Sequence, residues 1–467
     1  MGGKWRALTT AALFKQQGAI RALGTAVIAA HPQLAATLAE HGLTLDPVTG
    51  EVVELEPFNA SMSKRSAQIK RNLDRMGAEW QAEHPGETPG PALTARMQDA
   101  AWAFQRPSRK PADLKDEQWW RQELTDAGYA PDTLTRRAAQ AAVSVDDLAV
   151  QDVASRALDR CAAAASTWTP HTVAEQVARI ITEADVRATP ARLREFIDLA
   201  TDLATEDCFS VLPPGAPAPK HVAHLTSLNV IADETALRDQ LTAATPEREP
   251  EHPDVTRKAQ AARLDAGQTV AAAAVASTDP LVIVEGAAGS GKTTMLRTAI
   301  TVGAEHGRPS RVVASTLRAA QVAEEELGVP ATSVAALVHA HGWRWNDDGV
   351  WTRLAPGDTD PTTGSTYNGP PENARLDRRV RVIVDEAGML DQDTTHALLT
   401  ITQEAGATVA LIGDRAQLPA VGRGGVLDMA AQIRGRTYDM TELHRFADAE
   451  YVALTLAMRD RGHPGAI

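Results

Sequence analysis

The feature that most constrains this chain is an apolar run that leads straight into a glycine-rich turn and then a helical pattern. Residues 281–284 read Leu-Val-Ile-Val, residues 286–294 read GAAGSGKTT, and residues 295–297 continue as a helix. Glycines let consecutive backbone N–H groups and the helix N-terminus face an anion, so GxxxxGKT in this context predicts a phosphate-binding loop. Such a strand, loop and helix belong to an α/β domain with a parallel sheet.

The side chains of this loop predict which nucleotide groups it binds. We expect Lys292 to reach the β- and γ-phosphates and the Thr293 hydroxyl to ligate Mg²⁺, so ATP and Mg²⁺ are the expected cofactors. The residues expected to contact the nucleotide are Gly286, Gly289, Ser290, Gly291, Lys292, Thr293 and Thr294.

Two further apolar runs end in polar residues suited to nucleotide hydrolysis. Residues 381–384 precede Asp385 and Glu386, and in a parallel sheet that end of the strand lies beside the phosphate loop. We expect Asp385 to hold Mg²⁺ through water and Glu386 to act as general base for the attacking water. Residues 408–412 lead to Gln417, whose amide is expected to sense the γ-phosphate and couple hydrolysis to movement.

Length and charge limit the protein class. At about 150 residues per domain, 467 residues should form about three domains. Hydrophobic residues make up 43% and charged residues 23%, which excludes wholesale disorder. The net charge of −13 argues against coating nucleic acid through bulk positive charge, although local basic patches remain open.

Cysteine usage and hydropathy predict a cytoplasmic protein without membrane insertion. Cys161 and Cys208 lie far apart and show no CxxC spacing, which leaves no disulfide framework and no zinc knuckle. No run reaches the roughly 18 consecutive apolar residues that a membrane span needs.

Composition and punctuation divide the chain into four segments. We expect residues 1–125 to form a small α+β piece, 126–212 a helical connector, 213–255 a linker with a small helical element, and 256–467 the phosphate-loop domain. The boundary near residue 212 rests on a proline-rich run that cannot continue a helix.

Two patterns in the first segment predict secondary structure. Residues 50–56 alternate apolar and acidic side chains, which predicts a short strand. Residues 62–76 predict a helix with Ile69, Leu73 and Met76 on one face and basic residues on the other.

An ordered set of motifs resembles those of RecD-like superfamily 1 DNA helicases. The set comprises Gln268, GAAGSGKTT (286–294), ASTLRAA (314–320), VDEAGML (384–390), GDRAQLPAVGRGG (413–425) and TELHRF (441–446). The resemblance implies a RecA-like domain in which Gln268 reads the adenine and Arg445 reaches toward the γ-phosphate. It also implies that Ser315-Thr316 and the loop after Val421 touch single-stranded DNA.

The beginning of the chain resembles the closing part of the relaxase domain of TrwC/TraI-type (MobF) conjugative relaxase-helicases. The likeness rests on Gly3-Lys4-Trp5-Arg6, on residues 62–69 and on the helical connector. It implies that residues 1–125 are a relaxase tail and that the chain is an ATP-hydrolysing DNA helicase or translocase module in plasmid transfer. The implied partners are single-stranded DNA and either the conjugation machinery or a second chain that supplies a second motor domain.

Two departures from that family lead us to expect a truncated or split form. The family's tyrosine nucleophile and three-histidine metal site would precede this sequence, and its second motor domain would follow Ile467. The chain's tyrosines match no nucleophile position; they are Tyr129, Tyr367, Tyr438 and Tyr451. We therefore expect ATP binding, weak hydrolysis, no processive unwinding and no nicking.

Two alternative functions remain open at this point. One is a nucleotide-gated DNA-binding or tethering protein that uses ATP only to set a conformation and does not unwind DNA productively. The other is an active nicking relaxase. The basic clusters at residues 62–76 and 106–110 grip phosphates or form ordinary solvated surface, and the second use is the commoner one.

Tryptophans and histidines suggest further sites with competing structural explanations. Trp343, Trp345 and Trp351 either stack on bases or pack a small hairpin, and we favour the hairpin. His339 and His341 lie two apart in a helical pattern and so point about 200° from each other, which argues against a shared metal. We expect His221 and His224 to be a surface pair that could share a helix face.

Overall fold

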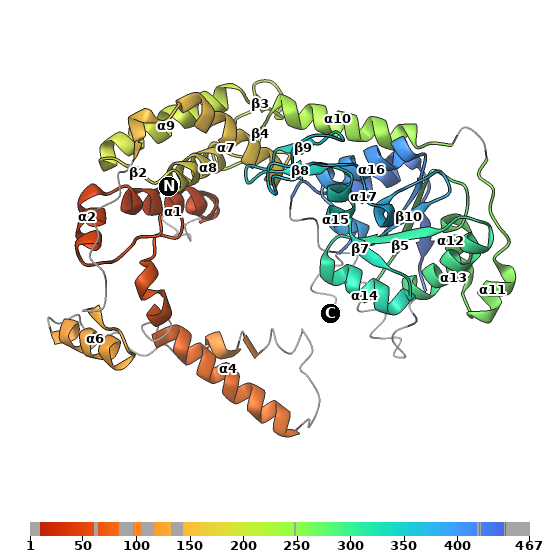
Figure 1. The fold of residues 1–467 in the computed structure, drawn as a ribbon, viewed down its shortest axis with the longest axis horizontal. Coiled ribbons are helices and arrows are strands. Elements are labelled where there is room, and N and C mark those ends of the chain that lie inside the picture. The colour runs from red at the N-terminus through yellow and green to blue at the C-terminus, as the bar shows by residue number, and fades with distance from the viewer. Residues whose placement is uncertain are drawn as a thin grey trace, which may run out of the picture. The chain divides into compact units, whose positions relative to one another are not determined.

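The computed structural model describes residues 10–59, 64–83, 97–98, 100–103, 115–131, 143–246, 249–417, 420, 422–442 and 444. Residues 1–153 with 177–200 form one compact unit, and residues 154–176 with 201–467 form the other. The dividing points fall inside α7 (Val150–Ala164), α8 (Pro170–Glu183) and α9 (Pro190–Glu206), so the chain alternates between the units. Figure 1 traces the elements along the chain.

The first unit is largely helical. Besides parts of those three helices, its elements are α1 (Ala11–Ala29), α2 (Pro32–Glu40), the 3-10 helix η1 (Val53–Phe58), α4 (Lys64–Glu83), α6 (Lys115–Asp126), β1 (Val143–Ser144), the 3-10 helix η3 (Val145–Asp147) and β2 (Val186–Arg187). In α4, Ile69 is buried and Leu73 and Met76 are half-buried, so the predicted apolar face is confirmed. The basic cluster at 106–110 lies outside the described residues.

The strand predicted at residues 50–56 is wrong. Val52 makes only one antiparallel bridge, to Leu45, and the chain then turns into η1. The Glu54 carboxylate accepts a hydrogen bond from the Thr44 N–H at 2.6 Å, which folds the acidic residue back onto the preceding backbone. Pro57 lies inside η1 and has no N–H to donate to a strand ladder.

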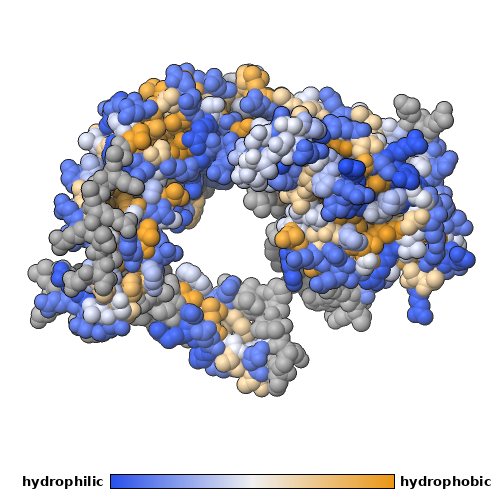
Figure 2. All heavy atoms as spheres, in the orientation of Figure 1, coloured by the Kyte–Doolittle hydropathy of each residue, from blue (hydrophilic) through white to orange (hydrophobic). Residues whose placement is uncertain are grey.

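Apolar side chains remain exposed in the helical part of the chain. They include Leu13, Phe14, Ile20 and Ile28 on α1, and orange patches interrupt the hydrophilic surface in Figure 2.

No single helix among the described residues is long and apolar enough to cross a membrane. The helical segments Ala12–Ala29 and Pro32–Glu40 are long and apolar enough only when they are taken together, and the two are bent by 56° relative to each other.

A six-stranded sheet organises the second unit. Its order is β12 (Tyr438–Met440), β5 (Leu281–Gly286), β11 (Thr408–Gly413), β10 (Arg381–Asp385), β6 (Ser310–Ala314) and β7 (Ala331–Ser333), with parallel pairing throughout. The predicted parallel α/β sheet is confirmed. Because β11 lies between β5 and β10, the loop after β11 begins between the two strand ends that carry the predicted nucleotide residues.

Helices cover both faces of the sheet. Leu281 and Ile283 of β5 pack in a core with α10 (Leu228–Ala243), α15 (Val334–Ala340), α16 (Gln392–Ala405) and α17 (Val426–Arg434). Val282 and Val284 pack in a second core with α12 (Ala266–Val275), α13 (Lys292–Glu305) and α14 (Leu317–Leu327). Successive strand side chains point to opposite faces, so the uninterrupted apolar run fits a sheet buried on both sides. Apart from a hairpin of two strands described next, the remaining elements are α11 (Thr256–Ala261), β3 (Phe209–Ser210), β4 (Leu225–Thr226), η4 (Glu372–Ala374) and η5 (Ala387–Met389).

The predicted tryptophan hairpin is present within this unit. β8 (Trp343–Trp345) and β9 (Trp351–Arg353) pair antiparallel, and the ring centroids of Trp345 and Trp351 lie 4.7 Å apart. Trp343 packs against the sheet core.

The turn of this hairpin contacts α7. Asp348 accepts from Arg156 Nε and Arg160 Nε, each at 2.6 Å. A Cβ added at Gly349 would lie 2.3 Å from Ala163 Cβ, so glycine permits the close approach.

Candidate nucleotide site

The phosphate loop joins β5 to α13 at the carboxyl edge of the sheet. β5 ends at Gly286, and α13 begins at Lys292 with Gly291 as its N-cap at φ +78°. A Cβ at Gly286 would lie 2.5 Å from Ser290 Oγ, and one at Gly291 would lie 2.3 Å from Gln268 Nε2. A side chain at Gly286 would displace the Ser290 hydroxyl and one at Gly291 would displace the Gln268 amide, and at Gly291 the positive φ also favours glycine.

Polar groups of the loop are positioned to meet an anion. Lys292 Nζ donates to the Gly286 carbonyl at 2.9 Å, and Gly289 adopts φ +88° in the loop between them. Ser290 Oγ is buried without a hydrogen-bond partner among the described residues, and Thr294 lies in the first turn of α13. A bound phosphate chain would pair the Ser290 hydroxyl and replace the internal lysine contact, so these residues fit a nucleotide.

The two predicted Mg²⁺ ligands come from different elements at this edge of the sheet, Thr293 from α13 and Asp385 from β10. Thr293 Oγ1 donates to Glu326 Oε2 of α14 at 2.8 Å. Asp385 ends β10; burial and then the Glu386 charge raise the pKa of its carboxyl, against the lowering effect of Lys292. A divalent cation favours the ionised carboxylate, and hydroxyl and carboxylate oxygens are the ligands that Mg²⁺ prefers, so both residues fit the ion.

Glu386 occupies a strained turn directly after β10. Its φ is +52°, and its N–H donates to Asp385 Oδ1 at 3.0 Å. Among the described residues only Asp185 and Arg263 share a positive φ without being glycine. Strain of this kind costs about 1–3 kcal/mol and concentrates at functional sites.

The loop after β11 is tied to the strand that precedes the phosphate loop. Arg415 pairs with Glu285 of β5 at 2.6 Å and with Asp428 of α17 at 3.0 Å. A Cβ at Gly388, just after Glu386, would lie 2.9 Å from the Asp414 carbonyl, so the loops after β10 and β11 are in contact. Gln417 is exposed in this loop. Its role at the γ-phosphate stays a prediction.

Gln268 contacts the phosphate loop through a hydrogen bond within the protein. The side chain is buried; its Oε1 accepts from the Asp265 N–H at 3.0 Å and its Nε2 donates to the Ser290 carbonyl at 2.9 Å. Reading an adenine would require the amide to exchange one of these partners, and that role stays a prediction.

The predicted DNA-contact residues are placed in part. Thr316 Oγ1 accepts from the Ala319 N–H at 3.1 Å as the N-cap of α14, and Ser315 Oγ is buried and has no partner among the described residues. Val421 and Arg445 lie outside the described residues.

Comparison with known families places both ends of the chain. A family model described as TrwC relaxase matches residues 1–127, and one described as AAA domain matches residues 263–467. Together the two matches support a relaxase-helicase of the TrwC/TraI type. Its AAA match covers the whole six-stranded sheet, which confirms the RecA-like fold expected after a relaxase region. A comparison of the sequence with curated proteins found no match.

The two domain matches imply general functional properties. An AAA-type P-loop domain binds nucleotide, usually with Mg²⁺, and a relaxase region joined to a helicase-type domain implies DNA binding. The relaxase-helicase assignment is therefore confirmed at the level of its domains.

Two residues of this relaxase-helicase site escaped sequence reasoning. His444 donates its N–H to the Gly289 carbonyl at 2.8 Å, and its Nε2 lies 2.7 Å from Asp265 Oδ2. The TELHRF motif contained His444, but only its arginine was assigned a role. Glu326, the partner of Thr293, lies in an ordinary acidic run of an exposed helix face, and nothing in its spacing marks it.

The structure places the side chains of the two histidine pairs. His339 is exposed at the end of α15, whereas buried His341 contacts the Ala374 carbonyl at 2.9 Å, so the two side chains diverge as predicted. His221 and His224 do not share a helix, and the surface-pair expectation is wrong for His224, which is buried with Nδ1 2.8 Å from the Val222 carbonyl. Among the described residues no group of three His, Cys, Asp or Glu side chains could hold a metal.

Proposed function

We propose that this relaxase-helicase binds ATP and Mg²⁺ at residues 286–294 and hydrolyses ATP to move along single-stranded DNA during plasmid transfer. One observation carries the proposal. Asp385 ends β10 and Glu386 follows it at the same sheet edge as the phosphate loop, and β11, which leads into the Gln417 loop, lies between β10 and β5.

Each residue has a distinct role in this proposal. Lys292 and the loop N–H groups hold the phosphates, while Thr293 and Asp385 hold Mg²⁺, which when bound supplies Lewis-acid charge to the phosphoryl oxygens. Glu386 takes the proton of the attacking water. Gln417 and Arg445 respond to the γ-phosphate, and Gln268 contacts the base.

ATP turnover with and without single-stranded DNA tests the proposal. Lys292→Ala should lose nucleotide binding and turnover together. Glu386→Gln should keep binding and lose turnover by about 10²–10⁴-fold, the usual contribution of a general base. Glu325→Gln makes the same chemical change on an exposed helix face and should behave as the wild type.

The same assay distinguishes ATP-driven movement from the main alternative function. A protein that uses nucleotide only to gate DNA binding would bind both ligands, yet its turnover would not respond to DNA. In that case wild-type turnover would match that of Glu386→Gln.

A further inference from the structure

The loop between β11 and α17 is tied to the rest of the unit by an arginine near each of its ends. We call it the sensor loop, because it carries Gln417, the predicted sensor of the γ-phosphate. Arg415 and Arg423 each pair with two carboxylates that lie outside the loop. The sensor loop spans residues 414–425, of which the structure describes 414–417, 420 and 422–425.

Arg415 joins the beginning of the sensor loop to the strand that leads into the phosphate loop. Its Nε and Nη2 lie 2.7 and 2.6 Å from Glu285 Oε2 of β5, and its Nη1 lies 3.0 Å from Asp428 Oδ1 of α17. Parallel pairing of β11 with β5 places Gly413 beside Glu285, so Arg415 reaches back across the end of its own strand. Glu285 is the last residue before the phosphate loop. Arg415 therefore fixes the beginning of the sensor loop beside the nucleotide site.

A tight turn extends this fixed position to Gln417. Asp414 is only 3% exposed; its carboxylate accepts from the Ala416 N–H at 3.0 Å, and its carbonyl accepts from the Gln417 N–H at 3.2 Å. These two hydrogen bonds close the turn on itself, while the ion pairs of Arg415 attach it to β5 and α17. A side chain on a loop keeps a functional position only when supporting contacts of this kind hold it.

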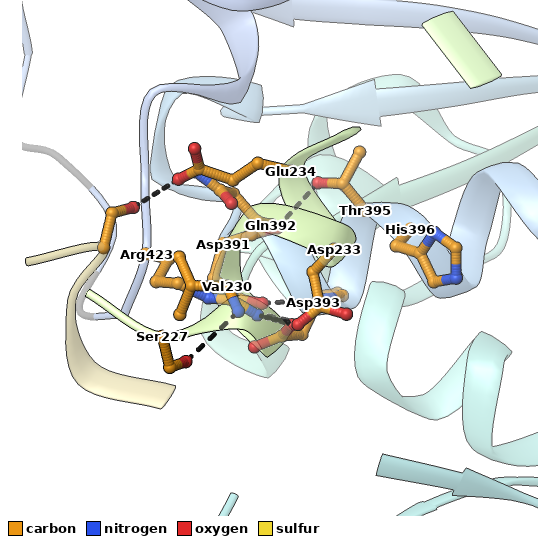
Figure 3. Close-up of polar contacts among 12 residues, drawn as sticks. Ser227, Val230, Asp233, Glu234, Asp391, Gln392, Asp393, Thr395, His396 and Arg423 are labelled. Carbon is orange, nitrogen blue, oxygen red and sulfur yellow. Dashed lines mark hydrogen bonds and ion pairs between the residues drawn. The ribbon is translucent and has the colours of Figure 1, made fainter. Parts of the chain in front are cut away.

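Arg423 holds the other end of the sensor loop in the protein interior. Its Nη2 contacts Asp393 of α16 and lies 3.0 Å from Asp233 Oδ2 of α10, as Figure 3 shows. The Gln392 N–H donates to the Arg423 carbonyl at 2.7 Å. The Arg423 side chain is 2% exposed, whereas that of Arg415 is 37% exposed. Because breaking a buried ion pair costs far more than breaking one in contact with water, the Arg423 end is fixed and the Arg415 end can adjust to a ligand.

We propose that Arg415 is a positioning residue that holds Gln417 where it meets the γ-phosphate, with Arg423 as the fixed end of the loop. The exposed Gln417 amide makes no hydrogen bond with another described residue, so its place depends on the turn that Arg415 anchors. The inference rests on the proposed function in one respect, namely that Gln417 responds to the γ-phosphate. It adds that the preference for ATP over ADP depends on an ion pair to β5.

The affinity of the full chain for nucleotides with and without a γ-phosphate tests this role. Titration with a non-hydrolysable ATP analogue and with ADP, both in Mg²⁺, measures the preference without turnover. Arg415→Gln should weaken analogue binding about tenfold, the value of one hydrogen bond to a charged group, and leave ADP binding within about twofold. Gln417→Ala should do the same. The double variant should bind the analogue no more weakly than Gln417→Ala alone, because Arg415 acts through Gln417.

Two further variants separate positioning from a general effect of charge. Arg415→Lys keeps a cation for Glu285 and should retain most of the analogue affinity. Arg379→Gln breaks a 2.9 Å ion pair to Asp377 on the protein surface, and it should bind both nucleotides as the wild type does. A loss of ADP affinity in Arg415→Gln as large as the loss of analogue affinity would mean that Arg415 touches the nucleotide itself or merely supports the fold. Either meaning would overturn the inference.

Hydrogen exchange of the nucleotide-free protein, followed by mass spectrometry, measures the anchoring directly. In Arg415→Gln the amides of Ala416 and Gln417 should exchange at least about tenfold faster, since local opening of the turn then costs less free energy. The Gln392 amide, bonded to Arg423 at the fixed end, should exchange as in the wild type. Unchanged exchange at Ala416 and Gln417 would overturn the inference, whatever the protein does with nucleotides.

Failure of the proposed function would have a different signature. A wild type that prefers the analogue to ADP but shows no turnover in response to DNA would contradict movement along DNA and support this inference. Equal wild-type affinity for the analogue and ADP, or additive losses in the double variant, would overturn the inference while DNA-stimulated turnover remained. Binding of neither nucleotide would overturn both.

Discussion

Single atoms decide what the phosphate loop tolerates. At Gly291 the space that a Cβ would take is filled by Gln268 Nε2, and at Gly286 it is filled by Ser290 Oγ. The loop motif therefore encodes a packing requirement as well as a backbone one. The contact between Gly286 and Ser290 spans a few positions of sequence, which makes that part of the loop predictable, whereas Gln268 reaches Gly291 from the separate helix α12.

A glycine substitution measures that packing requirement. Gly291→Ala should weaken nucleotide binding by at least tenfold, because its Cβ would displace Gln268 and distort the start of α13. Gly307→Ala is the matched control, with φ +70° and no atom within 4 Å of the added carbon. It should cost only the left-handed backbone penalty of about 1–2 kcal/mol. Titration with a fluorescent ATP analogue and thermal unfolding separate the two effects, and equal nucleotide affinity in both variants would contradict the packing argument.

Asp360 predicts an acid-sensitive contact in the insertion after the hairpin. The hydrogen bond from Arg344, followed by the Thr362 N–H, lowers the pKa of Asp360 to about 2 from an ordinary 3.8. A depressed carboxyl pKa stabilises the fold above pH about 3.8, and this stabilisation is lost as the pH falls toward 2.

Asp360→Asn should therefore lower stability at pH 7 and flatten the stability profile below pH about 4. Denaturant unfolding of both proteins at pH 7 and near pH 3 measures the difference. An unchanged acid slope in the variant would rule out this contact as its source.

Elements farther apart in sequence meet in ways that no local pattern reveals. Asp348 in the hairpin turn bridges Arg156 and Arg160 of α7. Burial opposes ionisation of Asp348, but the two arginine hydrogen bonds outweigh it and hold the pKa below its ordinary value.

The hairpin bridge gives a prediction with a neighbouring control. Asp348→Asn should destabilise the protein by about 2 kcal/mol, since a charged hydrogen-bond acceptor serving two arginines is lost. A change of that size lowers Tm by about 4–8 °C in a domain of this size class. Asp347→Asn, exposed and adjacent, should shift Tm by less than about 1 °C. Scanning calorimetry checks both, and equal shifts would show that the bridge contributes nothing.

At the level of elements, the predictions were correct where the local sequence determines the secondary structure. They failed where contacts with residues outside the predicted segment determine it. The apolar runs before Gly286 and Asp385 form strands as predicted, because each is buried on both faces. Residues 50–56 do not, since their alternating pattern is overridden by Pro57 and by the Glu54 contact to Thr44. Glu326 meets Thr293 only because α14 packs beside α13, which no sequence spacing records.

For the whole molecule, net charge limits how DNA is held. With −13 overall, binding must come from a few local contacts. Each neutralised phosphate of a single strand contributes about −0.7 to the slope of log affinity against log salt. We expect a slope between about −1 and −4, measured by anisotropy across a range of NaCl concentrations. A much steeper slope would indicate an extended basic surface.

The position of β5 in the sheet also governs when the nucleotide site forms during synthesis. Its neighbours on either side, β11 and β12, leave the ribosome more than a hundred residues later, at Thr408–Gly413 and Tyr438–Met440. Until Met440 has emerged, the strand that leads into the phosphate loop has an open edge on at least one side. A nascent chain therefore passes through a long interval in which the loop has been made but its sheet is incomplete. Chaperones that cover apolar strand edges should be needed most in that interval.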